Sequence, residues 1–170
     1  SFFLSPDPLI MARLMPYMQL MRIPNVFTAM ADIFMGYLIV LQSFYPLRDF
    51  FFLLTASCCL YTGGMVLNDI FDYDQDLSER PQRPLPSGRI RIISAWKLCL
   101  ALGLMGICCA ALAGKQSFLI AVLLLITIIL YDVFLKHYWT GPIAMGCCRM
   151  LNVLLGMSPM LQSMVSLEGN

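Results

Sequence analysis

Acidic and amide side chains gather in one short stretch of this chain, NDIFDYDQD, from Asn68 to Asp76. If one helix runs through it, at about 100° per residue, four of these side chains fall within roughly a 100° arc: Asn68, Asp69, Asp72 and Asp76. Asp74 points away from this face. Asp72 and Asp76 are one turn apart, about 6 Å in rise, so both carboxylates can approach the same cation.

Three interpretations of this acidic stretch are open. A solvated loop at a membrane surface is one, although a loop needs no helical spacing. A calcium-binding loop would use Asp72, Asp74 and Asp76 as its first ligands. However, Leu77 stands where that loop needs glycine, and Arg83 where it needs glutamate. We favour a Mg²⁺ ion that carries a phosphate, because stacked carboxylates repel unless neutralised and Mg²⁺ binds through carboxylate and phosphate oxygens.

Basic residues follow at once, in RPQRPLPSGR from Arg80 to Arg89. The three prolines and the glycine of this segment prevent a regular helix. Arg80, Arg83 and Arg89 offer planar groups of donors that suit phosphate oxygens. Near a membrane, such residues can simply attract anionic headgroups. Directly after the aspartates, they favour a clamp for a diphosphate.

The elements that must position these residues are apolar helices. Hydrophobic residues make up 59% of the 170 residues and charged residues only 12%, with a mean hydropathy of +0.77, which excludes a water-soluble domain. Runs of about 20 residues can cross a hydrocarbon core, and they predict about five spans, near residues 26–42, 50–67, 94–113, 117–135 and 142–164. We therefore predict an all-α fold, a multi-pass transmembrane helical bundle. Nothing indicates a nucleic-acid partner, and the seven cysteines lack the spacing of a metal site.

The basic residues between the spans predict the orientation of this integral membrane protein. Most lysines and arginines lie before the first span and in the connections on the side of residues 68–97. Short basic loops remain in the cytoplasm. We therefore expect residues 68–91, the acidic stretch and the basic loop, on the cytoplasmic side. Residues 1–22 are expected to include a short interfacial helix.

Polar residues also occur within the first and fifth predicted spans, where they are costly at membrane depth. One side of the first span carries Arg22, Asn25, Asp32 and Gly36, and one side of the fifth carries Gly146, Arg149, Asn152 and Gly156. Such stripes either face a wet chamber or form close contacts between helices. We expect Arg22 and Arg149 to attract an anion, and both alternatives stay open for Asp32 and Asn152.

NDIFDYDQD followed by RPQRPLPSGRI resembles the first signature of the UbiA superfamily of intramembrane prenyltransferases, N-D-x-x-D-x-x-x-D and then R-P-L-P-S-G. LMRIPNVFTAMADIFMG is similar to the family's first helix and LYDVFLKH to its Y-x-x-x-K element, while LYDVFLKH and CRMLNVLLG also resemble the EboC-like branch. The resemblance implies nine spans around a cavity open to the membrane. Residues 1–170 would then be the N-terminal half of a single domain, and a second aspartate motif would follow the fifth span.

The resemblance also implies roles for individual residues. The Mg²⁺ ligands would be Asn68, Asp72 and Asp76, with Asp69 as an auxiliary. The diphosphate would be held by Arg80, Arg83 and Lys136, to which the polar stripes add Arg22, Asn25 and Arg149. Catalysis would depend on Asp72, Asp76 and Lys136. Tyr131 stands one residue further from Lys136 than the family pattern requires, and Asp132 takes the tyrosine position, so an Asp132–Lys136 pair is an alternative use of this lysine.

The predicted activity is Mg²⁺-dependent transfer of a prenyl group from an isoprenyl diphosphate to an aromatic or other lipophilic acceptor in the bilayer. No nucleophilic serine, cysteine or histidine is required. One alternative is a non-catalytic relative that binds or helps to export a prenylated or aromatic metabolite. Another is a multi-pass scaffold with a site for lipid headgroups.

Overall fold

The computed structural model describes residues 8–168, and within this range every regular element is a helix. The elements are α1 (Pro8–Leu20), η1 (Ile23–Asn25), α2 (Val26–Leu41), α3 (Leu47–Phe71), α4 (Tyr73–Glu79), α5 (Ile92–Ala113), α6 (Lys115–Val133), η2 (Leu135–His137) and α7 (Gly141–Glu168). Among the described residues, five helical segments are long and apolar enough to cross a membrane. The prediction of an all-α, multi-pass bundle with five spans is therefore confirmed.

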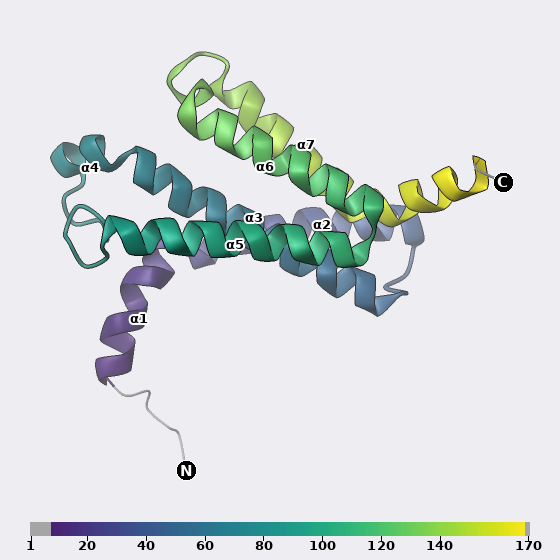
Figure 1. The fold of residues 1–170 in the computed structure, drawn as a ribbon, viewed down its shortest axis with the longest axis horizontal. Helices are drawn as coiled ribbons and strands as arrows, with labels where there is room; N and C mark the ends of the chain where they lie inside the picture. The colour runs from purple at the N-terminus through teal and green to yellow at the C-terminus, as the bar shows by residue number, and fades with distance from the viewer. Residues whose placement is uncertain (1–7, 169–170) are drawn as a thin grey trace, which may run out of the picture.

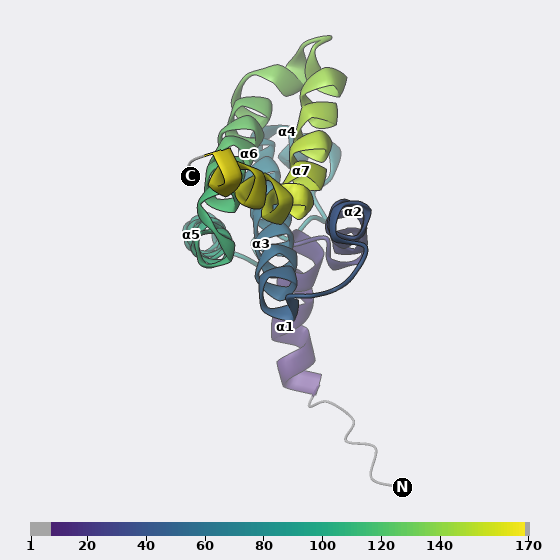
Figure 2. The same cartoon turned by 90° about the vertical axis from the view of Figure 1, so that its right-hand side faces the viewer.

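Helix α3 occupies the middle of the bundle, with α2, α5, α6 and α7 arranged around it (Figure 2). It can be buried because apolar or small residues occur on all of its sides. Leu53, Ala56 and Leu60 of α3 belong to the main apolar core, which Ile33 of α2 and Leu155 of α7 complete. The polar residues that α3 carries near its end are thus held by a rigid, central helix.

The neighbours of α3 also contact one another. Helix α5 lies beside α3, and α6 and α7 form a neighbouring pair (Figure 1). A single residue, Gly114, separates α5 from α6, with φ 154° and ψ 169°. L side chains rarely adopt this backbone conformation. The outer face of α5 leaves Leu100 and Leu104 exposed, as expected of side chains that face lipid.

Helices α2 and α7 approach each other closely through two glycines. A Cβ atom on Gly36 would collide with the carbonyl oxygen of Val153, and one on Gly156 would lie 2.9 Å from the carbonyl oxygen of Ile33. The polar stripes were expected either to face a wet chamber or to form close contacts between helices. For Gly36 and Gly156, the structure shows the close contact. Gly146 has no atom within 4 Å of such a Cβ, so it is not part of this contact.

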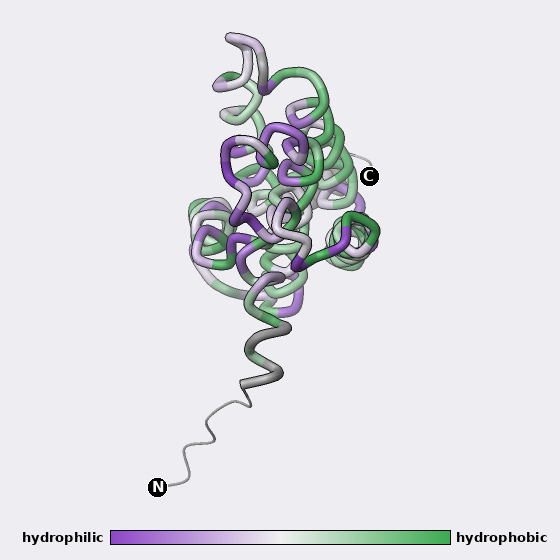
Figure 3. The backbone as a smooth tube through the Cα atoms, turned by 90° about the vertical axis from the view of Figure 1, so that its left-hand side faces the viewer, coloured by the Kyte–Doolittle hydropathy of each residue, from purple (hydrophilic) through white to green (hydrophobic). Residues whose placement is uncertain are grey.

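The end of the bundle that carries α4 is its most hydrophilic part (Figure 3). A second apolar cluster stabilises this end, because Leu85 and Ile90 of the connection between α4 and α5 are buried against Val66 of α3 and Leu20 of α1. Helix α1 itself projects away from the bundle (Figure 1). It covers most of the expected N-terminal helix, while residues 1–7 lie outside the described residues and its interfacial position stays a prediction.

Candidate active site

The acidic stretch lies at a break between two helices. Helix α3 ends at Phe71, Asp72 has φ −86° and ψ 5°, and α4 begins at Tyr73. The helix thus continues past Leu67, as the common face requires, but a break at Asp72 separates α3 from α4. The break is small, because the amide of Asp72 still donates to the carbonyl of Asn68 at 2.9 Å and that of Asp76 to Asp72 at 2.8 Å.

The aspartates of this stretch differ in burial as the helical spacing predicted. Asp69 and Asp76 are only 5% and 3% exposed, Asp72 is half-buried and Asp74 is exposed. Buried carboxylates need partners with opposite charge or good hydrogen bonds. Arg83 supplies both, with its Nη1 atom 2.5 Å from Asp76 and 3.4 Å from Asp69. Arg22 is a second basic partner of Asp69, because its Nη2 atom lies 2.7 Å from Oδ1 of this aspartate.

Lys136 joins this site from the other side of the bundle. It lies in η2, after α6 has ended at Val133, and its Nζ atom lies 2.5 Å from Oδ1 of Asp72. The alternative pairing of Lys136 with Asp132 is not the one observed, because the chain leaves the helix between the two residues. Asp132 instead accepts a hydrogen bond from the amide of Asn68 at 3.1 Å.

The charges at this end of the bundle are not balanced. Among the described residues, the carboxylates of Asp69, Asp72 and Asp76 pair with Arg22, Arg83 and Lys136, whereas the nearby carboxylate of Asp132 has no ion pair. Asp132 is buried, at 2% exposure, yet its hydrogen-bond partner is a neutral amide. A cation bound here would supply the missing charge. The candidate ligand atoms are all oxygens, which suits Mg²⁺. Among the described residues, however, no three Asp, Glu, Cys or His side chains lie close enough together to hold a metal ion by themselves.

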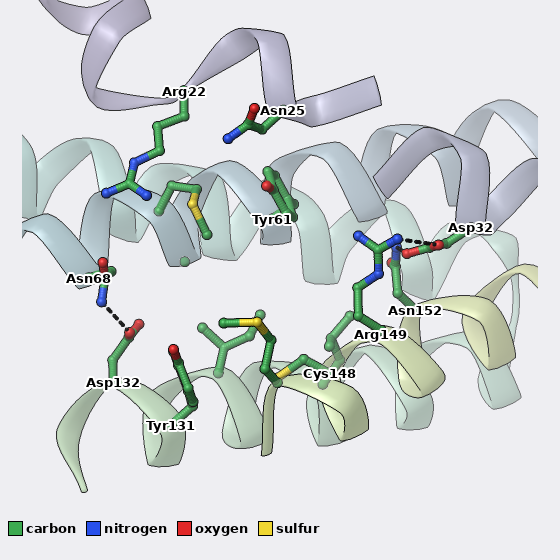
Figure 4. A pocket seen from close by; sticks show the side chains of 15 residues that line it. Arg22, Asn25, Asp32, Tyr61, Asn68, Tyr131, Asp132, Cys148, Arg149 and Asn152 are labelled. Atoms are coloured by element: carbon green, nitrogen blue, oxygen red, sulfur yellow. Dashed lines mark hydrogen bonds and ion pairs between the residues drawn. The ribbon is translucent and has the colours of Figure 1, made fainter. Parts of the chain in front are cut away.

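A cavity of about 350 Å³ extends from this end into the bundle (Figure 4). Its outer end is lined by Arg22, Asn25, Asn68, Tyr131 and Asp132. Apolar and aromatic side chains line its middle, among them Tyr61, Met65 and Ile128. The chamber thus joins an apolar space to a charged mouth, which is the arrangement that a lipid-like molecule with a charged head requires.

The deep end of the cavity is lined by three polar residues, Asp32, Arg149 and Asn152 (Figure 4). Together with Ser57, which donates to Asn152, they form a second polar cluster, called the deep cluster. Asp32 accepts hydrogen bonds from Arg149 and Asn152, both at 3.1 Å. Asn152 in turn accepts from Ser57 at 2.7 Å and donates to the carbonyl of Ala29 at 3.2 Å. For Asp32 and Asn152, both open alternatives hold, because they line the chamber and also connect α2, α3 and α7.

A smaller pocket of about 260 Å³ lies on the outer side of the charged mouth. It is lined by Gln19, Arg22, Asp69, Gln82, Arg83 and Arg89. Arg89 donates to the side chain of Gln19 at 3.1 Å and to the carbonyl of Gln82 at 2.5 Å. Arg22 lines both cavities, so it separates the chamber from the outer pocket.

The structure brings together most of the residues expected at the diphosphate site. Arg22, Arg83 and Lys136 lie around the acidic stretch, and Asn25 lines the chamber. Asn25 belongs to the first spanning segment, Ile23–Leu41, as expected. Arg22 precedes this segment, because its left-handed backbone (φ 47°) interrupts the helix.

Two residues of the expected diphosphate set lie elsewhere. Arg80 is exposed, lines neither cavity and forms no ion pair with the described residues. Arg149 belongs to the deep cluster.

Sequence reasoning missed several residues of the chamber. Tyr61 and Gly64, which line it, and Ser57 of the deep cluster were not singled out. With Asn68, they follow the i, i+4, i+7, i+11 spacing of one helical face. This stripe lies within a run so rich in apolar residues that its polar members did not stand out. Asp132 was considered only as a partner of Lys136, because its contact with Asn68 joins residues 64 positions apart.

Comparison with known proteins decides the family. Residues 29–166 match the family model of the UbiA prenyltransferase family. The chain belongs to the UbiA prenyltransferase family. This agrees with the aspartate signature, and it places the charged mouth and the chamber in a member of a known class of membrane protein.

Two curated UbiA relatives are digeranylgeranylglyceryl phosphate synthases. That of Saccharolobus solfataricus is 35% identical over 141 residues, which are 82% of this chain and 50% of the relative. That of Sulfurisphaera tokodaii is 36% identical over 121 residues, which are 71% of this chain and 43% of the relative. The chain thus spans about half the length of the curated relatives it matches. The similarity to the EboC-like branch stays a prediction.

Solved structures show the same fold. A structure of a digeranylgeranylglyceryl phosphate synthase superimposes with a TM-score of 0.80 and 29% identity, over 85% of this chain and 52% of that one. A UbiA homologue from Archaeoglobus fulgidus bound to DMAPP and Mg²⁺ gives a TM-score of 0.75 at 19% identity, over 84% of this chain and 53% of that one. The helical arrangement described here is therefore that of UbiA proteins.

Proposed function

We propose that the full-length protein transfers a prenyl group from an isoprenyl diphosphate to a lipophilic acceptor within the membrane, in a Mg²⁺-dependent reaction. The observation that carries this proposal is the chamber itself. Its apolar middle can hold an isoprenoid chain, while Arg22, Asn68 and Asp132 line its outer end. This end adjoins the ion pairs that Asp69, Asp72 and Asp76 form with Arg22, Arg83 and Lys136. The names of the relatives support transfer of a geranylgeranyl group in particular.

The residues at the mouth would bind the diphosphate in this mechanism. Arg83 and Lys136 carry charge-assisted donors that can exchange their carboxylate partners for phosphate oxygens. Mg²⁺, held by Asn68, Asp69, Asp72 and Asp76, would supply Lewis-acid stabilisation of the leaving diphosphate. Supporting this, UbiA homologues from Archaeoglobus fulgidus have been solved with DMAPP or GPP and Mg²⁺.

The chamber would then protect the reacting carbon. As the allylic C–O bond breaks, its electron pair leaves with the diphosphate and the carbon gains cationic character. Tyr61, Met65 and Ile128 would exclude water from this carbon, so the acceptor's nucleophile bonds to it first and loses its proton. The oriented donors at the mouth would stabilise the negative charge as it develops.

A turnover measurement tests this proposal. The full-length protein in lipid nanodiscs receives geranylgeranyl diphosphate, Mg²⁺ and either a geranylgeranylated glyceryl phosphate or an aromatic acceptor. We expect a prenylated product and inorganic diphosphate, and we expect EDTA to abolish both. Binding of the diphosphate without product from any acceptor would instead favour the non-catalytic binding role.

We also propose that the charged mouth faces the cytoplasm, since the connections at this end carry most of the basic residues. A reporter domain that becomes fluorescent only in the cytoplasm, inserted after Gly88, would test this. Gly88 is exposed, and a Cβ there would meet nothing within 4 Å. Fluorescence is expected for this insertion and not for one after Gln42, at the opposite end of α2. The reverse pattern would contradict the proposed orientation.

A further inference from the structure

We infer that Arg149, held in place by Asp32, binds an anionic group of the acceptor at the deep end of the chamber. This inference rests on the proposed function and specifies the chemical class of the acceptor. Arg149 would be a specificity-determining residue, separate from the residues that bind the diphosphate. The anion can be a phosphate monoester or a carboxylate, because both present the oxygen pair that a guanidinium recognises.

The position of Arg149 separates it from the diphosphate site. Arg149 belongs to the deep cluster. In this cluster, the hydrogen bond from Ser57 of α3 to Asn152 marks the level of α3 at which the cluster lies. Ser57 lies about three turns before Asn68 on this helix, which corresponds to roughly 16 Å of rise. Figure 4 shows Asp32 and Asn152 at one end of the chamber and Asn68 and Asp132 at the other. One diphosphate cannot contact both ends, so the two ends suit two different charged groups.

The guanidinium of Arg149 also has donors to spare. Its side chain is 50% exposed, and it lines the chamber (Figure 4). Its only hydrogen bond within the described residues is from Nη2 to Asp32, whereas a guanidinium has five N–H donors. An arginine in an apolar chamber is costly, and an anionic group would satisfy the remaining donors.

Asp32 is suited to position this arginine and is not free for other uses. Both of its carboxylate oxygens are occupied, Oδ1 by Arg149 and Oδ2 by Asn152. It is buried, at 6% exposure, so the anion would meet the free edge of the guanidinium and not the carboxylate. An acceptor held in this way would point from the deep end towards Asn68, near which the allylic carbon would lie.

A simpler role for Arg149 is to neutralise Asp32, and a binding measurement separates the two. The full-length protein in neutral-lipid nanodiscs is first saturated with Mg²⁺ and an unreactive geranylgeranyl thiolodiphosphate, which occupies the mouth. The affinities of hexyl phosphate, heptanoate and the neutral probe 1-hexanol are then measured by equilibrium dialysis. We expect the wild type to bind one or both anions more tightly than the alcohol. The comparison of hexyl phosphate with heptanoate then identifies phosphate or carboxylate as the favoured group.

Two variants remove the anion site. One leaves the Asp32 carboxylate without its arginine partner, and the other also removes the charge of this carboxylate. Arg149→Met should weaken binding of the preferred anion by about tenfold or more, since charged hydrogen bonds are lost, and leave binding of 1-hexanol unchanged. The double variant Asp32→Asn with Arg149→Met should remain equally weak. Arg91→Met, an exposed arginine outside both cavities, is the matched control and should behave as the wild type.

Three results would overturn the inference: no preference for either anion in the wild type, unchanged anion affinity in Arg149→Met, or wild-type affinity in the double variant. The last would mean that Arg149 only neutralises Asp32. Turnover is measured in parallel. Product formation with anion binding that does not need Arg149 defeats the inference alone, whereas Arg149-dependent binding without any product defeats the proposed function alone.

Discussion

At the scale of single residues, Asp72 and Asp74 form a natural pair for comparison. They lie two positions apart in the same acidic stretch, yet Asp72 contacts Lys136 at 2.5 Å while Asp74 is exposed. The proposed site uses only the first. Two aspartates of one motif should therefore differ sharply in function although they barely differ in sequence position.

We predict that Asp72→Asn lowers product formation by the full-length enzyme about a hundredfold or more, because it removes a carboxylate that would hold the Mg²⁺ ion needed to stabilise the leaving diphosphate. The Mg²⁺ concentration for half-maximal rate should also rise. Asp74→Asn should leave both quantities within about twofold of the wild type. Steady-state rates over a Mg²⁺ titration measure this, and equal rates for the two variants would remove Asp72 from the metal site.

The sequence identified most single residues of the mouth, since the aspartates and arginines are close in sequence and their chemistry can be read directly. It placed Arg149 with the diphosphate and overlooked Ser57. Which end of a chamber a side chain reaches depends on how helices far apart in sequence pack, and α2, α3 and α7 supply the deep cluster together. No local spacing contains that information.

At the scale of elements, the irregular connection between α4 and α5 depends on two apolar anchors. Leu85 and Ile90 are 3% and 2% exposed, and they fix the segment that carries Arg83 and Arg89. The prolines of the connection explain why it is not a helix, which the sequence predicted. The sequence did not show that Leu85 is buried under the loop.

We predict that Leu85→Ala raises the Michaelis constant for the prenyl diphosphate several-fold, because loss of a buried leucine side chain loosens the segment that presents Arg83. The maximal rate should change less. Leu77→Ala, at an exposed leucine of α4, is the matched control and should leave the Michaelis constant unchanged. An unaltered constant for Leu85→Ala would show that the anchor does not position the basic residues.

The contact between α2 and α7 makes a second prediction at this scale. Gly36→Ala should destabilise the full-length protein by about 1–3 kcal/mol, because the added methyl group collides with the backbone of α7. Gly146→Ala, where the same methyl group meets nothing within 4 Å, should be neutral or slightly stabilising. Thermal unfolding in detergent compares the two. Equal unfolding temperatures would contradict the close approach of these helices.

At the scale of the whole molecule, composition predicted the class of fold better than any motif did. Runs of apolar residues are a strong signal for spanning helices, because each must satisfy its own backbone hydrogen bonds in lipid. The central place of α3 was not predictable in the same way. Lipid and helix interiors are equally apolar, so hydropathy does not show which spanning helix is surrounded by the others.

The central claim is that the charged mouth of the chamber, together with the adjacent side chains of Asp72, Asp76, Arg83 and Lys136, holds a prenyl diphosphate and a divalent cation, with the prenyl chain in the chamber. The direct measurement is a crystal structure of the full-length protein with Mn²⁺ in place of Mg²⁺ and geranylgeranyl thiolodiphosphate. Anomalous scattering from Mn²⁺ should appear beside Asp72, with the diphosphate near Lys136 and the chain along Tyr61 and Ile128. A diphosphate bound outside this mouth, or a chamber left without the prenyl chain, would contradict the account.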